Sequence, residues 1–320
     1  MKNFITLLFL GMMLLTSCSK EEVKTGQECP EQLIRITTGV DIGLTTKAAI
    51  TTGVFPTTRD MIVSSWHAAS SQNHFKSTRF TYSTGAWMAD KSWPLSGNLD
   101  FLAISQGSSS ITDVTWGTPD ATASVQFAMP DNSSVQEDIL IGCAASIAAN
   151  TDVVIDFKHP QALLVFTAKS SDAYNSTTNR GITINSITLK SAKYSGTMLA
   201  QRSSGSLEFF WSSLGSSKTV AVPGLTTTNL TKTVTTLGDG ILLPEQTEVG
   251  FVISYTLHNG TDTAGNLVNT AMSYDYTPSS PCSWEAGKKY TYGIDITMKG
   301  INITPSVALW DTGANKEIIL

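Results

Sequence analysis

Residues 182–189 read Ile-Thr-Ile-Asn-Ser-Ile-Thr-Leu, so aliphatic side chains alternate with hydroxyl and amide side chains. Successive side chains of a β-strand point to opposite faces, and this pattern therefore predicts a strand with one face in a hydrophobic core. Similar short apolar runs, bounded by Gly, Asn, Asp, Ser or Pro, recur along the chain at residues 33–36, 99–104, 153–157, 162–168, 249–257 and 290–298. No window of twelve or more residues keeps apolar positions at helical spacing. The sequence predicts an all-β protein.

The composition favours the same fold class and excludes several functions. The 320 residues include 43 Thr and 37 Ser, a quarter of the chain, but only 15% are charged. Thr suits the pleated surface of a sheet and is an indifferent helix former. With a net charge of −5 and a pI of about 5.4, the chain has no basic stripe for nucleic acid, and we expect no nucleic-acid partner. A hydrophobic share of 41% excludes a wholly disordered chain.

The amino terminus has the pattern of an export signal. Lys2 precedes an apolar run of twelve residues, Phe4 to Leu15, which is too short to span a bilayer. The run ends in Leu-Thr-Ser-Cys at residues 15–18, which resembles a bacterial lipobox. This resemblance implies that residues 1–17 are a signal peptide and that acylated Cys18 anchors the mature chain in the outer membrane. An ordinary signal peptide with a chance cysteine is the alternative.

Residues 18–30 would then be a lipidated tether. Residues 19–22, Ser-Lys-Glu-Glu, resemble the acidic export signal that sends Bacteroidetes lipoproteins to the cell surface. A solvated linker rich in Lys and Glu explains them equally well.

The spacing of the strands predicts the domain organisation. Strands recur about every ten residues with turn residues between them, which is typical of β-sandwiches and barrels. The composition changes near residues 148–151, and a dense new set of strands begins at Val153. We therefore expect two β-sandwich domains, residues 31–150 and 151–320. In the second, residues 153–159 and 162–167 should form a strand pair joined at Pro160.

Cysteines and histidines give little sign of bridges or metal. Three cysteines follow Cys18, namely Cys29, Cys143 and Cys282, so the fold rests on its core with at most one bridge. Whether Cys143 and Cys282 are paired stays open. The four histidines are scattered, and no Cys-x-x-Cys occurs, so we expect neither a metal nor a cofactor.

The sequence contains none of the complete catalytic motifs considered below. Asp311-Thr312-Gly313 matches the turn of aspartic proteases, but those enzymes need two such aspartates. This chain has one copy with only seven residues after it, so a turn is the better interpretation. The Ser-hydrolase elbow, the phosphate-binding loop and His-Glu-x-x-His are all missing from the sequence. We therefore expect no enzyme activity and assign no catalytic residues.

Seven motifs in a fixed order resemble the Mfa-like fimbrillin family of Bacteroidetes. They extend over nearly all of the mature chain. The motifs are Trp93-Pro94 before the strand at 99–103, Asp138-Ile139-Leu140, Asp156-Phe157-Lys158-His159, the Ile/Thr strand closed by Gly196, Leu243-Pro244-Glu245-Gln246, residues 284–292 (Trp-Glu-Ala-Gly-Lys-Lys-Tyr-Thr-Tyr) and Val307-Ala308-Leu309-Trp310.

The resemblance implies a subunit of a surface fimbria, the type V pilus, built from two tandem transthyretin-like (Greek-key) β-sandwiches. Its partners would be other fimbrial subunits and the outer membrane. In stalk members of the family a protease removes the first strand, and a strand of the neighbouring subunit fills the groove. This mechanism is physically sound, because a sandwich without one strand exposes apolar core and unpaired backbone groups that a new strand can satisfy.

The resemblance also points to the residues involved. The strand to be removed would be residues 32–40, and cleavage would fall at Lys47, where the family often has arginine, or at Arg59. No processing is an equal alternative, since anchor and tip subunits need not be cut. The tail Ile318, Ile319 and Leu320 is either a donor strand for a neighbour or, by a slight preference, an edge strand of its own domain.

Seven tryptophans support a second class of function. Exposed aromatic rings bind sugars, so the runner-up is a surface lipoprotein that binds a glycan or another ligand, from a host or a bacterial surface, without polymerising. Several coplanar, exposed Trp faces would favour it. In a sandwich most Trp side chains fill the core instead.

Overall fold

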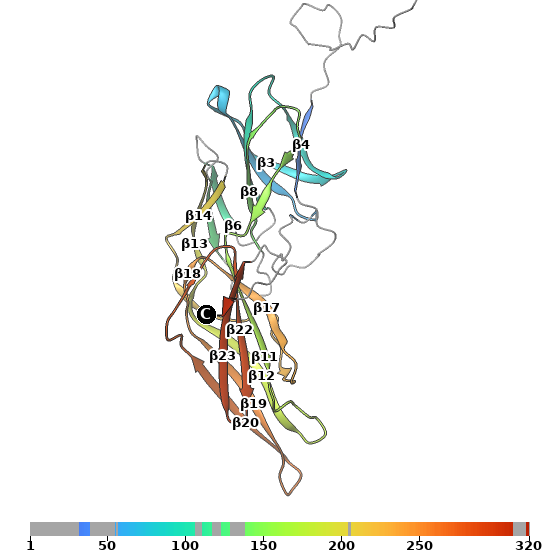
Figure 1. Ribbon diagram of the computed structural model, residues 1–320, viewed down its shortest axis with the longest axis vertical. Helices are drawn as coiled ribbons and strands as arrows, with labels where there is room; N and C mark the ends of the chain where they lie inside the picture. Colours follow the sequence, from blue (N-terminus) through green and yellow to red (C-terminus); the bar gives the residue numbers. More distant parts are fainter. Residues whose placement is uncertain are drawn as a thin grey trace, which may run out of the picture. The chain divides into compact units, whose positions relative to one another are not determined.

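The computed structural model describes residues 32–38, 55, 57–105, 111–116, 123–128, 138–203, 206–309 and 318–319 (Figure 1). Contacts divide the chain into residues 1–31 and residues 32–320, and the elements below belong to the second unit. In the described ranges regular structure is β-strand, apart from one turn of 3-10 helix at Ala68–Ser70. The prediction of an all-β fold is confirmed. None of the described segments forms a helix that could cross a membrane.

An eight-stranded sheet contains most strands of the amino-terminal half. Its order is β10-β8-β5-β2-β3-β4-β1-β9. The first part of β3 pairs with β2 and its last three residues pair with β4, so the sheet turns at this strand. The strands are β1 (Leu33–Thr37), β2 (Met61–His67), β3 (Gln72–Ser83), β4 (Ala86–Ser92), β5 (Leu99–Ser105), β8 (Ile141–Ile147), β9 (Val153–Val154) and β10 (Asp156–Lys158).

The turned sheet encloses one hydrophobic cluster, which we call the amino-terminal core. Large aromatic and aliphatic side chains from seven of its strands meet there, as in a sandwich. The core consists of Ile34, Ile36, Phe55, Met61, Val63, Phe75, Phe80, Trp87, Leu99, Phe101, Ala103, Leu140, Ala144, Val153, Ile155 and Phe157.

Two further sheets pack face to face in the carboxyl-terminal half. One has the order β17-β11-β22-β23-β24, and the other has the order β15-β12-β19-β20 with β16 beside β12. Phe166, Phe251 and Tyr292 meet between them with ring centroids 5.1–5.4 Å apart. The strands are β11 (Ala162–Lys169), β12 (Arg180–Lys193), β15 (Ser217–Ala221), β16 (Thr228–Asn229), β17 (Thr235–Leu243), β19 (Phe251–Thr261), β20 (Leu267–Tyr276), β22 (Lys288–Thr297), β23 (Gly300–Leu309) and β24 (Ile318–Ile319).

A four-stranded sheet combines strands from both halves of the sequence. Its order is β14-β13-β7-β6, and Met198 of β13 lies opposite Val125 of β7. The domain boundary at residue 150 stays a prediction, and β9 and β10, which follow it, pair with β1 and β8. The remaining strands are β6 (Ile111–Trp116), β7 (Ala123–Ala128), β13 (Ser195–Ser203), β14 (Ser206–Ser212), β18 (Gln246–Thr247) and β21 (Ser283–Trp284), the last two paired with each other.

The expected strand pair on either side of Pro160 was wrong. β9 and β10 belong to the eight-stranded sheet, whereas β11 pairs antiparallel with β17 and parallel with β22. The chain forms no hairpin at this junction, because Pro160 and Gln161 are hydrogen-bonded to other parts of the chain. Gln161 is buried and accepts a hydrogen bond from the Ile139 amide at 3.1 Å, and the Pro160 carbonyl accepts one from Trp211 Nε1 at 2.7 Å.

The run at 182–189 forms part of β12, but its alternation shifts phase in the middle. Ile184 lies opposite Tyr255 and Ser186 opposite Ser254, so Asn185 is one extra residue on this strand. This β-bulge returns the following aliphatic side chains to the core face, and Ile182, Ile184, Ile187 and Leu189 are all fully buried. The predicted strand is therefore confirmed. The bulge was not predicted, because a regular alternation of side chains would not require one.

Candidate functional site

The first candidate site is strand β1. It lies between two neighbours, antiparallel to β4 and parallel to β9. Ile34 and Ile36 are 0% exposed and belong to the amino-terminal core, while Leu33 and Arg35 point outward. Burial of two such side chains is worth about 1.5–3 kcal/mol each. The predicted alternation of this strand is confirmed.

Strand β1 also completes backbone hydrogen bonding on both sides. The Ile155 amide donates to the Thr37 carbonyl at 3.0 Å, and the Trp93 amide donates to the Gln32 carbonyl at 3.2 Å. Without β1, the facing backbone groups of β4 and β9 would lose their partners and the core would be open at Ile34 and Ile36. Such a groove has the chemistry that binds an extended peptide strand.

Arg59 is half-buried and held at two points. Its Nη1 donates to the Asp138 carbonyl at 2.5 Å, and its own carbonyl accepts a hydrogen bond from Trp87 Nε1 at 2.8 Å. Trp87 is buried in the amino-terminal core and stacks edge-on against Phe55, with ring centroids 5.3 Å apart. The peptide bond that an arginine-specific protease would cut is thus fixed to the core.

Asp138 and His159 form a buried pair that the sequence did not reveal as a unit. His159 Nδ1 lies 2.9 Å from the Asp138 carboxylate, and both side chains are at most 1% exposed. The two residues come from separate motifs of the family resemblance, 21 residues apart. Those motifs contain both residues, but neither motif alone indicates the pair. Because the Asp138 carbonyl also accepts from Arg59, the pair joins the junction near Pro160 to the segment before β2.

The tail is placed only in part. Ile318 and Ile319 form β24, which pairs with Val307 and Ser306 of β23 in the same chain. Leu320, like Cys18 and Lys47, lies outside the described residues. The donor and edge-strand hypotheses for the tail both remain predictions.

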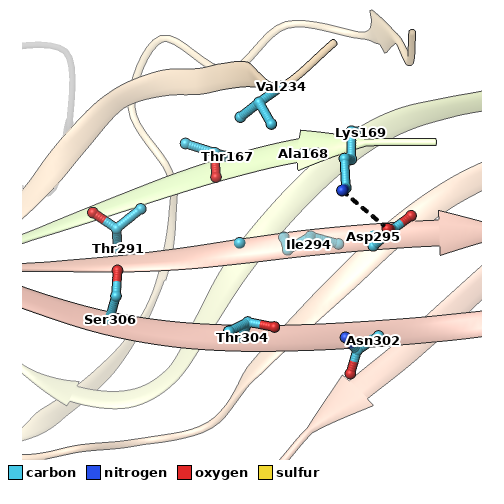
Figure 2. A pocket seen from close by; sticks show the side chains of 11 residues that line it. Thr167, Ala168, Lys169, Val234, Thr291, Ile294, Asp295, Asn302, Thr304 and Ser306 are labelled. Atoms are coloured by element: carbon cyan, nitrogen blue, oxygen red, sulfur yellow. Dashed lines mark ion pairs between the residues drawn. The ribbon is translucent and has the colours of Figure 1, made fainter. Parts of the chain in front are cut away.

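The outer face of the β11-β22-β23 sheet has a hollow of about 470 Å³ (Figure 2). Gly293 lies at its centre, with Thr167 and Thr304 directly opposite on the neighbouring strands. Lys169 and Asp295 form an ion pair 3.5 Å apart at one end. A Cβ atom on Gly293 would meet the Thr304 carbonyl at an ordinary 3.4 Å, so the backbone does not require glycine here. The hollow is a hydroxyl-lined surface without a catalytic pair.

A buried carboxylate, Glu248, directly follows β18, which pairs with β21. Glu248 accepts hydrogen bonds from Tyr292 Oη at 2.9 Å and from the Cys282 amide at 3.2 Å. Burial, with the Glu248 charge second, raises the pKa of the Cys282 thiol to about 11, which keeps it protonated and unreactive. No disulfide joins Cys143 to Cys282. Within the described ranges, no group of three or more His, Cys, Asp or Glu side chains could hold a metal ion.

The tryptophans whose side chains are described form no exposed platform. Trp66, Trp87 and Trp284 are buried, and Trp93 and Trp211 are half-buried. The side chains of Trp116 and Trp310 lie outside the described set. These five side chains therefore give no support to a glycan-binding surface, which would need several exposed, coplanar Trp rings.

The chain is similar to proteins described as fimbrillin-like, fimbrial or cell adhesion proteins. A family model described as fimbrillin-like matches residues 40–310. The crystal structure of a fimbrial protein from Bacteroides vulgatus ATCC 8482 is 14% identical, has a TM-score of 0.61 and covers 87% of this chain and 99% of its own. A candidate cell adhesion protein from Bacteroides uniformis ATCC 8492 is 18% identical, with a TM-score of 0.52 and coverage of 87% and 98%.

A third structure, a candidate cell adhesion protein from Bacteroides ovatus ATCC 8483, is 13% identical with a TM-score of 0.51 and covers 89% of this chain and 99% of its own. At these identities the structures establish the fold alone. Among curated proteins, none matches the chain.

Proposed function

Because the chain belongs to the fimbrillin-like family, we propose that it is a structural and adhesive subunit of a surface fimbria, assembled by strand complementation between subunits. The observation that carries this proposal is the position of β1, a short strand that fills an apolar slot between two others. A strand from a neighbouring subunit could occupy the same slot with the same burial and backbone pairing. The role is structural, so the proposal includes no catalytic step and no cofactor.

Removal of β1 requires a cut between it and β2, and the two candidate positions differ in cost. A cut after Arg59 would break its bonds to Trp87 and Asp138 and would also release Phe55, which is fully buried against Trp87 and Phe157. A cut after Lys47 would release β1 and leave Phe55 on the chain. These contacts favour Lys47, or no processing, over Arg59.

The tail is the proposed donor. In the described structure β24 pairs with β23 through two residues at the end of its sheet, so its release breaks little. Deletion of Asn315–Leu320 should abolish surface polymers while the subunit stays folded. Unchanged polymerisation after the deletion would show that the tail is an ordinary edge strand.

The anchor is part of the same proposal. Acylation of Cys18 would place the subunit on the outer membrane and at the cell surface before assembly. Replacement Cys18→Ala should then leave the chain in soluble fractions, whereas Cys29→Ala, eleven residues further along, should not change its membrane association. Equal partitioning of the two variants would argue against the lipid anchor.

Mass spectrometry of chains recovered from surface polymers tests the assembly mechanism. An amino terminus at Ala48 supports removal of β1 after Lys47, and Lys47→Gln should block it while Arg59→Gln leaves it unchanged. An amino terminus at Asp60 would reverse our order of the two positions. Polymers made only of chains that retain acylated Cys18 and β1 would contradict strand replacement.

A further inference from the structure

Strand β20 is a long edge strand. It is ten residues long, ends the order β15-β12-β19-β20 and pairs with β19, with one register shift whose extra residue lies on β19, between His258 and Thr261 (Figure 1). Among the residues that the structure describes, no strand pairs with its other side. At about 3.4 Å per residue, the open edge offers a row of backbone donors and acceptors about 34 Å long.

This edge lacks the features that normally prevent pairing with another chain. Edge strands are usually short, bulged, or protected by Lys or Pro. The sequence of β20, Leu-Val-Asn-Thr-Ala-Met-Ser-Tyr-Asp-Tyr, contains no Lys, Pro or Gly and a single charge. Leu267 is 62% exposed, and Val268 and Met272 are also exposed.

Two other edges of the same half, β15 and β17, are protected. Strand β15, at the opposite edge of the same sheet, has five residues and carries exposed Lys218. Strand β17 has an irregular register and contains Gly238 and Gly240, both with positive φ, on either side of Asp239. Neither of these two edges is as open as β20, although β14, the seven-residue edge of the four-stranded sheet, also lacks Lys, Pro and Gly and exposes Phe210.

The single charge on β20 is neutralised within the chain. Asp275 forms an ion pair with Lys190 of β12, two strands away. A second β20 can therefore approach without like-charge repulsion. If the centre of an antiparallel pair lies anywhere from Thr270 to Ser273, Asp275 falls opposite an uncharged residue of the other copy.

We propose that β20 pairs antiparallel with β20 of a second copy about a two-fold axis, which joins the two copies' β15-β12-β19-β20 sheets into one. Residues opposite each other in an antiparallel pair point to the same face, so one residue at the centre must lie opposite itself. Two strands alone bury little area, so the contact belongs to the weak class of interfaces. Copies held side by side in a polymer or on a membrane raise its occupancy. This lateral contact does not depend on β1 or on the tail.

A scan of single cysteines tests the proposed register. In the intact chain, purified in detergent with Cys29, Cys143 and Cys282 changed to Ser, Thr270→Cys, Ala271→Cys, Met272→Cys and Ser273→Cys are oxidised separately. A step of one residue from the centre separates a residue from its copy by about 7 Å along the strand. A disulfide forms only when the Cα atoms are within about 7 Å.

We expect disulfide-linked dimers at one position and a steep loss at its neighbours. All four positions are exposed, so random collision would give equal yields. Thr219→Cys, exposed on the protected edge β15, is the matched control and should stay unlinked. Equal yields across the scan, or no link at any position, would overturn the proposal.

A second measurement does not need a disulfide. Met272→Lys places two positive charges close together across the pair, and we expect at least a tenfold loss of dimer in sedimentation equilibrium. Thr219→Lys should have no effect. A dimer that resists Met272→Lys, or an unmodified chain that is monomeric throughout, would contradict the pairing. Deletion of Asn315–Leu320 should leave the β20 disulfide unchanged, so failure of the donor-strand mechanism and failure of this contact are distinguishable.

Discussion

Strands β1 and β20 represent opposite ways for a sheet protein to meet another chain. Strand β1 has a neighbour on each side and buries Ile34 and Ile36 completely, whereas β20 has one neighbour among the described strands and no buried side chain. A strand from another chain can enter the slot of β1 only after β1 has left it, because β1 fills the slot. It can join β20 without displacing anything. Replacement is therefore strong and slow, and addition is weak and reversible.

The largest expected difference between the two strands is in stability. Ile36→Ala removes buried methyl groups from the amino-terminal core and should lower the free energy of unfolding by about 2–5 kcal/mol. Met272→Ala, at the exposed edge, should change it by less than about 0.5 kcal/mol. Urea unfolding measures both. Similar losses for the two variants would mean that β1 does not fill an essential slot.

A smaller effect concerns the attachment of the segment before β2. Trp87→Phe keeps an aromatic ring in the core but removes the donor to the Arg59 carbonyl, which should cost about 1–2 kcal/mol. Added arginine-specific protease should then cut faster after Arg59. Trp93→Phe, in contact with the same core, is the control. Equal cleavage rates in the two variants would remove the argument that Arg59 is protected.

The free energy of unfolding at alkaline pH should depend on Tyr276 of β20 and on Cys282. Burial, with Glu248 second, raises the pKa of Tyr276 to about 12 and that of Cys282 to about 11, from 10.0 and 9.0. The neutral forms are favoured in the folded state, so their contribution is complete below pH 9 and is lost as the pH rises from about 9 to 12. Cys282→Ala should flatten the part between pH 9 and 11 in urea unfolding. An unaltered pH profile in this variant would contradict the assignment.

The fold was predictable where alternation is local. Strand β1 and the core face of β12 follow from side chains that alternate, and the structure has both. The bulge at Asn185 was not predicted, because the run at 182–189 was interpreted as a regular alternation, whereas Ile184 and Ile187 share a face only through the extra residue.

Contacts between distant segments were not predictable in the same way. The partners of β9, β10 and β11 depend on buried Gln161 and on Pro160, whose hydrogen bonds reach residues 22 and 51 positions away. The Asp138–His159 pair is likewise invisible to local periodicity. The open edge of β20 was hidden for another reason, since its sequence is that of any strand and only the sheet order shows that it has one neighbour.

In the proposed assembly, β1 must leave its slot before the subunit can polymerise. Arg35 and Met88 lie opposite each other on β1 and β4, on the outer face, so Arg35→Cys with Met88→Cys can hold β1 in place without changing the core. In a chain whose only other cysteine is Cys18, we expect the oxidised double variant to fold but to form no surface polymers. Each single variant, and the double variant kept reduced, should polymerise normally. Polymers of the oxidised double variant at the level of the single variants would contradict strand replacement at β1.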